Sequence, residues 1–255
     1  MRFSKWHALG NSYLVVEQAD GGELSSERAR VLCSVEHGIG ADGVIEVLGT
    51  DGDAIDVRIW NPDGSTAEMS GNGTRIAARW LAARSGSTNV TVRVGKRHVT
   101  AAMLDGALVE TDIGPVVVAP PETIDVHGNA VELTSVDVGN PHAVIRCEEL
   151  SREVLLRLGP LIEIHARFPE RTNVQLVHPE SETEIAALVW ERGAGETAAS
   201  GSSAVAVAAV AVARGWSRSP VTVCMPGGDL LVRLEDGEAT LVGPAEPICS
   251  GETHL

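Results

Sequence analysis

One stretch decides the fold: SGSSAVAVAAVAV, from Ser200 to Val212. Its Ser-Gly start is followed by a run of alanine and valine that would make a helix apolar on every side. Such a helix is normally enclosed by other structure, and this run is too short for the roughly 20 residues of a membrane span. The stretch therefore predicts a buried helix over Ser203 to Arg214.

The same pattern occurs once earlier in the chain. Residues 57–60 (VRIW) lead to Ser70-Gly71, and residues 187–190 (ALVW) lead to Ser200-Gly201. Ten residues separate the tryptophan from the serine in both places. The first copy predicts a second alanine-rich helix, over residues 74–83.

A second pair of similar segments supports a duplication. Residues 10–13 (GNSY) and 139–142 (GNPH) lie 129 apart, and the two serines lie 130 apart. Ordered matches at one offset predict two similar halves, over residues 1–119 and 120–255. The boundary is expected at Pro120-Pro121, because consecutive prolines cannot donate backbone hydrogen bonds and suit a linker or a sheet edge.

Each half contains strand-like runs separated by turns. Residues 90–94, 107–111 and 221–224 alternate or are rich in valine, which favours strands. Residues 61–64 (NPDG) and 235–237 (EDG) contain residues typical of turns. The sequence thus predicts an α+β fold of two pseudo-symmetric halves, each a curled, mostly antiparallel, barrel-like sheet around a central helix.

The composition limits the partners. The 255 residues include 20 Lys and Arg against 35 Asp and Glu, a net charge of −15, and only 3% are aromatic. This charge disfavours nucleic acid and anionic membranes, and few rings are available to stack on bases. The opening residues Met1 to Lys5 lack the apolar core of a signal peptide. We expect a cytoplasmic protein with a small-molecule substrate; a homodimer stays open.

The cysteines do not form a recognisable site. Cys33, Cys147, Cys224 and Cys249 are widely separated and show neither metal-ligand spacing nor a disulfide pattern. We interpret them as reduced packing residues and predict no metal site.

The two Ser-Gly segments suggest a specific chemistry. A helix start presents unpaired backbone N–H groups, and the helix dipole adds positive potential, so it can hold a carboxylate. Two such starts facing each other across a cleft would place one side chain on each face of a substrate Cα, as inversion of that carbon requires. The alternative is that Ser70 and Ser200 only cap their helices.

Seven short segments carry a resemblance to a known family. They are KWHALGN (5–11), NPDGS (61–65), GNGTR (71–75), GNPH (139–142), RFPERTN (167–173), ERGAGET (191–197) and PGG (226–228). In this order they resemble the diaminopimelate epimerases, pyridoxal-independent amino-acid epimerases, over essentially the whole chain. The resemblance implies two pseudo-symmetric domains, an active site between them, and neither a metal nor an organic cofactor.

The resemblance also implies the substrate contacts. Polar side chains would come from Asn11, Asn61, Asn140, Asn173, Glu191 and Arg192. The backbone amides of Gly71, Asn72, Gly201 and Ser202 would hold the reacting carboxylate. Arg192 is the natural bidentate partner of a distal carboxylate. Structural alternatives stay open: Asn61 could serve a turn, Glu191 and Arg192 could form a surface pair, and His142 could be a structural histidine.

The chain departs from the family at its two acid/base positions, where Ser70 and Ser200 replace cysteines. A free thiol titrates near pH 8.5, whereas a serine hydroxyl is several units more basic. Helix-end stabilisation of about 1 kcal/mol would not populate the alkoxide at neutral pH. A neighbouring base is needed, and family positions suggest the pairs Ser70 with His142 and Ser200 with Glu191.

We therefore expect a diaminopimelate epimerase-like isomerase that interconverts LL- and meso-diaminopimelate in lysine biosynthesis, with activity that the two serines could impair. Three alternatives stay open: a member that binds an amino acid without turnover, a cysteine-to-serine variant made to trap a substrate, and a diverged dehydratase or isomerase. The last needs one strong base only, but the retained Asn11, Asn61, Asn173 and Arg192 argue against it.

Overall fold

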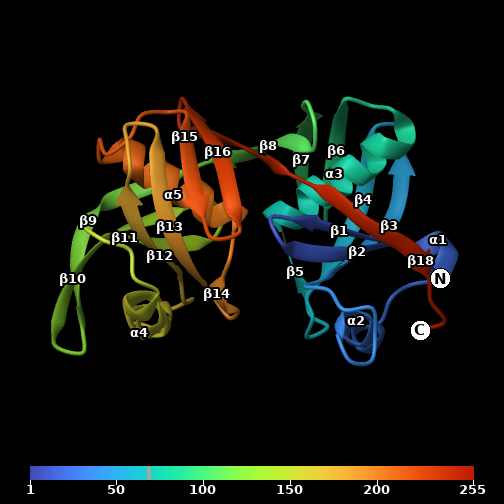
Figure 1. Cartoon of the computed structure of the whole chain (residues 1–255), viewed down its shortest axis with the longest axis horizontal. Helices are drawn as coiled ribbons and strands as arrows, with labels where there is room; N and C mark the ends of the chain where they lie inside the picture. Colours follow the sequence, from blue (N-terminus) through green and yellow to red (C-terminus); the bar gives the residue numbers. More distant parts are fainter. Residues whose placement is uncertain (68–69) are drawn as a thin grey trace. The chain divides into compact units, whose positions relative to one another are not determined.

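The computed structural model describes residues 1–67 and 70–255. The chain divides into two compact units: unit 1 comprises Met1–Asp112 and Val242–Leu255, and unit 2 comprises Ile113–Leu241. Each unit is a curled sheet around one helix, α3 (Gly71–Ser85) in unit 1 and α5 (Gly201–Ala213) in unit 2 (Figure 1). The predicted fold class is confirmed.

The remaining elements follow in chain order. Unit 1 contains β1 (Arg2–Ala8), β2 (Asn11–Glu17), α1 (Gln18–Gly21), α2 (Ser26–Cys33), β3 (Val44–Asp51), β4 (Ala54–Trp60), β5 (Thr66–Ala67), β6 (Asn89–Val94), β7 (Arg97–Met103), the start of β8 (Leu108–Pro115) and β18 (Glu246–Glu252). Unit 2 contains β9 (Val117–Val126), β10 (Asn129–Asp137), β11 (Pro141–Arg146), α4 (Arg152–Glu163), β12 (Asn173–Pro179), β13 (Glu184–Glu191), β14 (Gly195–Thr197), β15 (Val221–Met225), β16 (Gly228–Glu235) and most of β17 (Glu238–Pro244).

The two units repeat one strand arrangement. In unit 1, β2 pairs parallel with β3, β3 pairs antiparallel with β4, and β4 pairs parallel with β6. In unit 2, β11, β12, β13 and β15 pair in the same succession. The register repeats too: Val44 lies opposite Trp60, and Val174 lies opposite Trp190. This common register supports the duplication that the sequence predicts.

Both central helices connect parallel strands. A parallel pair needs a crossover long enough for a helix, and α3 joins β4 to β6 as α5 joins β13 to β15. Residues 203–211 of α5 are all buried, with strands of unit 2 around them. Both predicted helices are confirmed, and each begins directly after its serine. No helix in the described ranges combines the length and the apolar character needed to cross a bilayer.

The observed division of the chain differs in position from the expected boundary. Pro120 and Pro121 lie within β9, which pairs with β10 through a register shift between Thr134 and Val136. This irregularity accommodates residues that cannot donate to the ladder. The end of the chain, residues 242–255, groups with unit 1 because β18 pairs antiparallel with β1.

Two corresponding tryptophans, at the end of β4 and in β13, are each held by a buried carboxylate of their own. Trp60 Nε1 donates to Glu46 Oε2 at 2.9 Å, and Trp190 Nε1 donates to Glu163 Oε2 at 2.7 Å. Glu163 also accepts from the backbone N–H of Gly193 at 3.0 Å. Because a buried indole N–H needs an acceptor, these bonds fix the strands that lead toward the two serines.

The cysteines are free thiols, as predicted. Burial raises the pKa of Cys33 to about 11, and burial also raises the pKa of Cys224 to about 11, with Asp229 contributing. These two thiols are therefore protonated at neutral pH and behave as packing residues.

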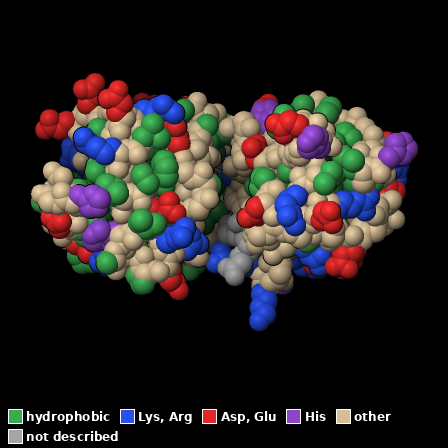
Figure 2. Space-filling model, turned by 90° about the horizontal axis from the view of Figure 1, so that it is seen from below, with side chains coloured by type: hydrophobic (Ala, Val, Ile, Leu, Met, Phe, Trp, Pro, Cys, Tyr) green, Lys and Arg blue, Asp and Glu red, His purple; other side chains and the backbone are tan. Residues whose placement is uncertain are grey.

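Opposite charges are interspersed over the surface. On the face seen in Figure 2, acidic and basic side chains alternate on each unit. Many are paired: Arg152 lies 2.7 Å from Glu196, and Arg167 lies 2.7 Å from Glu122. Exposed pairs of this kind contribute about 0–1 kcal/mol each, so the cores carry most of the stability.

Gly159 provides a test of the packing around Trp190. A Cβ at Gly159 would lie 2.7 Å from Trp190 Cγ, and Glu163 restrains that indole. We predict that Gly159→Ala lowers the free energy of unfolding by about 1–3 kcal/mol, measured by urea denaturation. Gly49→Ala is the control, because no atom lies within 4 Å of its added Cβ, and it should change stability by less than about 0.5 kcal/mol. Equal effects would contradict the prediction.

Candidate functional site

Ser70 and Ser200 have the same backbone conformation. Each precedes the first turn of its central helix, with φ −140° and ψ 119° at Ser70 and φ −144° and ψ 126° at Ser200. This extended conformation is typical of the residue before a helix, where the first N–H groups lack intrahelical acceptors. Both serines therefore stand at a helix start, as predicted; the binding of a carboxylate there stays a prediction.

The Ser70 hydroxyl contacts two groups of unit 1. Its Oγ accepts from the backbone N–H of Gly73 at 3.1 Å, so Ser70 caps α3. The same Oγ lies 3.0 Å from the phenol oxygen of Tyr13 on β2, and either oxygen can donate. Tyr13 was not predicted as a site residue, although the match between residues 10–13 and 139–142 aligns it with His142.

A buried cation lies in the first turns of α3. Arg75 is fully buried, and its guanidinium donates to Gly71 O at 3.2 Å and Asn72 Oδ1 at 2.6 Å. Among the described residues no carboxylate pairs with Arg75, and its Nε has no hydrogen-bond partner. Burial lowers the pKa of Arg75 to about 10, which leaves it charged at neutral pH. The corresponding position in α5 is Val205, so the duplication does not repeat this cation.

Ser200 is held differently. Within the described residues its side chain makes no capping bond to α5. Instead it interacts with the carboxyl group of Glu191, at the end of β13. Burial raises the pKa of Glu191, and the interaction with Ser200 partly opposes that rise. The structure thus brings Ser200 and Glu191 together; their catalytic roles stay a prediction.

His142 on β11 is saturated with hydrogen bonds inside unit 2. Its Nε2 lies 3.0 Å from Asn140 Oδ1, and its Nδ1 lies 2.9 Å from Gln175 Nε2. An amide nitrogen only donates, so Nδ1 accepts and Nε2 carries the proton. Burial lowers the pKa of His142 to about 3, so the ring is neutral. This arrangement suits the structural alternative, and the pairing with Ser70 stays a prediction.

Two of the predicted substrate contacts also hold backbone segments near the two serines in place. We call the residues around Ser70 in unit 1 and those around Ser200 in unit 2 the two half-sites. Asn11 Oδ1 accepts from Asn72 Nδ2 at 3.2 Å and so joins the start of β2 to the start of α3. Asn173 donates to Pro141 O at 2.9 Å and accepts from the backbone N–H of Arg192 at 2.9 Å. Asn173 therefore fixes the position of the segment that follows β13.

Asn61 and Arg192 differ in how far their side chains are already engaged in hydrogen bonds within the protein. Asn61 holds a turn, since its side chain donates to Ser65 Oγ at 2.9 Å. Arg192 is exposed, and its guanidinium donates to Glu170 O at 3.0 Å. No ion pair joins Arg192 to Glu191 in the part of the chain that the structure describes. Arg192 thus keeps donors for a ligand, whereas Asn61 has the turn role that sequence analysis left open.

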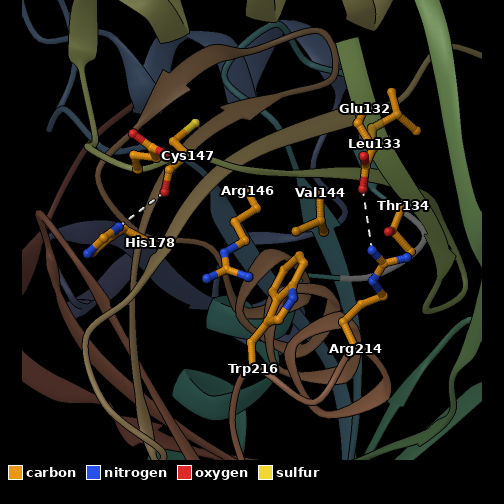
Figure 3. A pocket seen from close by; sticks show the side chains of 10 residues that line it. Glu132, Leu133, Thr134, Val144, Arg146, Cys147, His178, Arg214 and Trp216 are labelled. Carbon is orange, nitrogen blue, oxygen red and sulfur yellow. Dashed lines mark hydrogen bonds and ion pairs between the residues drawn. The ribbon is translucent and has the colours of Figure 1, made fainter.

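A separate hollow of about 470 Å³ lies in unit 2 after the end of α5. Figure 3 shows Trp216 between the guanidinium groups of Arg146 and Arg214, which lie 5.2 and 5.8 Å from its ring centroid. Glu132 pairs with Arg214 at 3.3 Å. The hollow lies at one end of α5, and Ser200 precedes the other end, about 20 Å away along the helix axis. The hollow is therefore distinct from the Ser200 half-site.

Comparisons with known proteins agree over the whole chain. The family model described as diaminopimelate epimerase matches residues 3–119 and 134–247. A diaminopimelate epimerase of Synechococcus elongatus is 37% identical over 276 residues, covering 100% of this chain and 99% of the relative. One of Bacillus licheniformis is 36% identical over 280 residues, covering 100% and 98%.

Solved structures show the same fold at low sequence identity. A predicted epimerase of Pseudomonas aeruginosa superposes with a TM-score of 0.73 at 17% identity, covering 100% of this chain and 99% of that one. A probable proline racemase of Agrobacterium radiobacter gives a TM-score of 0.75 at 18% identity, covering 100% and 93%.

The burial of Glu191 predicts a pH-dependent stability. The pKa of its carboxyl group is raised above the ordinary 4.5. Between the pKa of the unfolded chain and that of the folded protein, the folded state therefore holds a proton that the unfolded state has lost. The free energy of unfolding falls as the pH rises through this range. Glu191→Gln removes this loss. The variant should gain stability over the wild type on going from pH 4 to pH 8, measured by urea denaturation. The exposed Glu149→Gln should show no such gain, and equal behaviour of the two variants would contradict the argument.

Proposed function

This chain belongs to the diaminopimelate epimerase family, and we propose that it inverts one Cα of diaminopimelate between the LL and meso forms, in lysine biosynthesis. One observation carries the proposal: two serines occupy the same helix-start geometry, and each interacts with an ionisable side chain of its own unit. We further propose that it works in the cytoplasm and without pyridoxal phosphate or a metal.

On one face of the substrate, Ser200 and Glu191 act together. As the Cα–H bond breaks, Ser200 Oγ takes that proton and passes its own to the Glu191 carboxylate. The raised pKa of Glu191 makes its carboxylate a stronger base than an exposed carboxylate. The difference between its pKa and that of the serine hydroxyl is therefore smaller. Ser70 acts on the opposite face, where it supplies or removes the second proton.

The electron pair left on Cα spreads into the substrate carboxylate. Backbone N–H groups of Gly71, Asn72, Gly201 and Ser202 would stabilise that charge together with the two helix dipoles. The buried cation of Arg75 adds positive potential at α3. Within each unit the donors are fixed at a helix start before the substrate binds, which limits the reorganisation required in the transition state.

The distal end of the substrate would meet Arg192, Asn61 and Asn173. Arg192 supports this assignment because its guanidinium is exposed and its backbone is anchored by Asn173. A guanidinium presents paired donors that match a carboxylate, which an ammonium cannot do.

A second candidate function is binding of the amino acid without turnover. The observation in its favour is the saturated, neutral His142, which leaves the expected Ser70–His142 pair without a free base in unit 2. Both candidates share one pocket chemistry, so the rate of Cα proton exchange separates them.

Hydrogen exchange tests the proposed function. In deuterated water the wild type should exchange the Cα hydrogen of LL- or meso-diaminopimelate slowly. The Ser70→Cys, Ser200→Cys double variant should gain several orders of magnitude in exchange and epimerisation, because about 4–5 pKa units of mismatch correspond to about 5–7 kcal/mol. Each single variant should gain much less, since inversion needs a competent group on both faces.

The control for added thiols is Ser217→Cys, at a buried serine beyond the far end of α5, which should leave the rate unchanged. Binding of diaminopimelate is measured in parallel by calorimetry. A double variant that binds diaminopimelate but stays inert would show that the site has diverged and would refute the epimerase proposal.

Arg192→Lys tests the distal pocket. Loss of the bidentate geometry should weaken diaminopimelate binding by about 1–3 kcal/mol in calorimetry. Arg157→Lys, at an exposed position on α4, is the matched control and should bind as the wild type does. Equal affinities of the two variants would reject Arg192 as the distal ligand.

A further inference from the structure

Among the described residues, Tyr13 is an ionisable side chain in hydrogen-bond contact with the Ser70 hydroxyl. It is the single tyrosine of the chain, it is 7% exposed, and its phenol oxygen lies 3.0 Å from Ser70 Oγ. A buried phenol normally finds hydrogen-bond partners, and one of them here is the serine that the proposed function places at the substrate. The contact joins a weak acid directly to the reacting hydroxyl.

The backbone is built to hold the ring in this position. A Cβ on Gly43 would lie 2.5 Å from Tyr13 Cε1 and 2.8 Å from Trp60 O, so only glycine leaves room for the ring. The neighbouring Ser12 is fixed to Asp42 by two hydrogen bonds, of 2.7 Å from its N–H and 3.0 Å from its hydroxyl. The phenol therefore reaches Ser70 from a position fixed on both sides.

The charge around Tyr13 favours a proton acceptor there. Arg75 in α3 interacts electrostatically with the phenol and, among the described residues, has no carboxylate partner. A phenolate at Tyr13 would balance this buried cation. Asp42, also on this side, is exposed and directed to Ser12. Among the described residues, Arg75 thus has no carboxylate partner, and the Tyr13 phenol is a group beside it that can become negative.

The residue of unit 2 that corresponds to Tyr13 cannot accept a proton from its serine in the same way. Leu14 of β2 lies opposite Val44, and Ala143 of β11 lies opposite Val174, so Tyr13 corresponds to His142. His142 uses both ring nitrogens inside unit 2, on Asn140 and Gln175. Among the described residues, the serine of each unit thus interacts with an ionisable side chain: Ser70 with Tyr13, and Ser200 with Glu191.

We propose that Tyr13 is the proton partner of Ser70, a positioning residue that exchanges a proton with the Ser70 hydroxyl while this hydroxyl exchanges one with the substrate Cα. The inference rests on the proposed function. When Ser70 takes a proton, the Cα–H bond breaks, an O–H bond forms on Ser70 Oγ, and the original hydroxyl proton moves to the Tyr13 phenolate. The electron pair stays on the substrate and spreads into its carboxylate.

In the opposite direction, the phenol returns its proton to Ser70 Oγ as Ser70 delivers its own to the carbanion. A phenol ordinarily titrates near pH 10, several units below a serine hydroxyl. The pair can therefore move a proton without accumulating a serine alkoxide. Tyr13 supplies a proton acceptor for Ser70 in unit 1, whereas His142 uses both ring nitrogens inside unit 2.

The test uses the full-length Ser200→Cys variant as the parent, because a thiol on one face makes inversion depend on Ser70. Tyr13→Phe keeps the ring and removes only the phenol oxygen. In this parent it should slow conversion of LL- to meso-diaminopimelate at least ten-fold and remove the limb of the pH–rate profile that belongs to the phenol. In the Ser70→Cys, Ser200→Cys protein the same change should cost far less, because a thiol needs no relay.

An optical measurement gives a readout independent of turnover. Because the chain has one tyrosine, ultraviolet difference titration reports the ionisation of Tyr13 alone. Its midpoint should match the phenol limb of the pH–rate profile. Ser217→Ala, which removes another buried hydroxyl, is the matched control and should leave both rate and profile unchanged. Unfolding midpoints of all variants are compared with that of the parent.

The outcomes separate the two proposals. An inert double-cysteine protein refutes the proposed function. The double-cysteine protein could epimerise while Tyr13→Phe has the same effect in both backgrounds, or no effect in the parent. Tyr13 would then be only structural, and the inference would fail while the proposed function stands. A parent that does not invert diaminopimelate beside a fast double-cysteine protein also overturns it, because Ser70 would then lack a working proton partner.

Discussion

Enclosure of an entirely apolar helix is the constraint on which the rest of unit 2 depends. The α5 helix has no polar face to offer to water, so the strands before and after it must curl around it. Alanine and valine keep the helix narrow, which allows the strands to approach closely. Once the helix is enclosed, its start is fixed by the parallel pair β13 and β15. That start carries Ser200, whose position therefore follows from packing before any chemistry is considered.

Unit 1 shows how far a duplicated backbone can diverge in its side chains. The strand register and the conformation of the residue before the helix are retained, yet α3 contains the buried Arg75 where α5 has Val205. Among the described residues this cation has no carboxylate partner, and a buried cation is expensive unless a negative charge accompanies it. Its presence at a helix start, where the dipole is already positive, is hard to explain by stability alone. It makes sense where an anion is bound or formed.

The sequence predicted what is local and repeated, and missed what depends on the third dimension. The two Trp-to-Ser segments and their alanine-rich helices could be found because spacing survives duplication. Glu46 and Glu163 could not, since one lies in a strand and the other in a helix and they are joined to their tryptophans only by folding. The return of residues 242–255 to unit 1 was hidden for the same reason: strand pairing between distant segments leaves no periodic signal. Tyr13 lay in a quoted segment, but its contact with Ser70 crosses from β2 to α3.

Helix capping and proton transfer at Ser70 are alternatives when only the sequence is considered, whereas the geometry makes them compatible. A serine hydroxyl has two lone pairs and one proton. One lone pair accepts the Gly73 N–H, which leaves a lone pair and a proton for Tyr13 and a substrate. The cap also fixes the side-chain torsion, so the remaining groups point in defined directions. Ser200 lacks the cap among the described residues and is oriented by Glu191 instead. The two serines therefore have different proton environments on equal backbones, as expected if each handles one of two opposite steps.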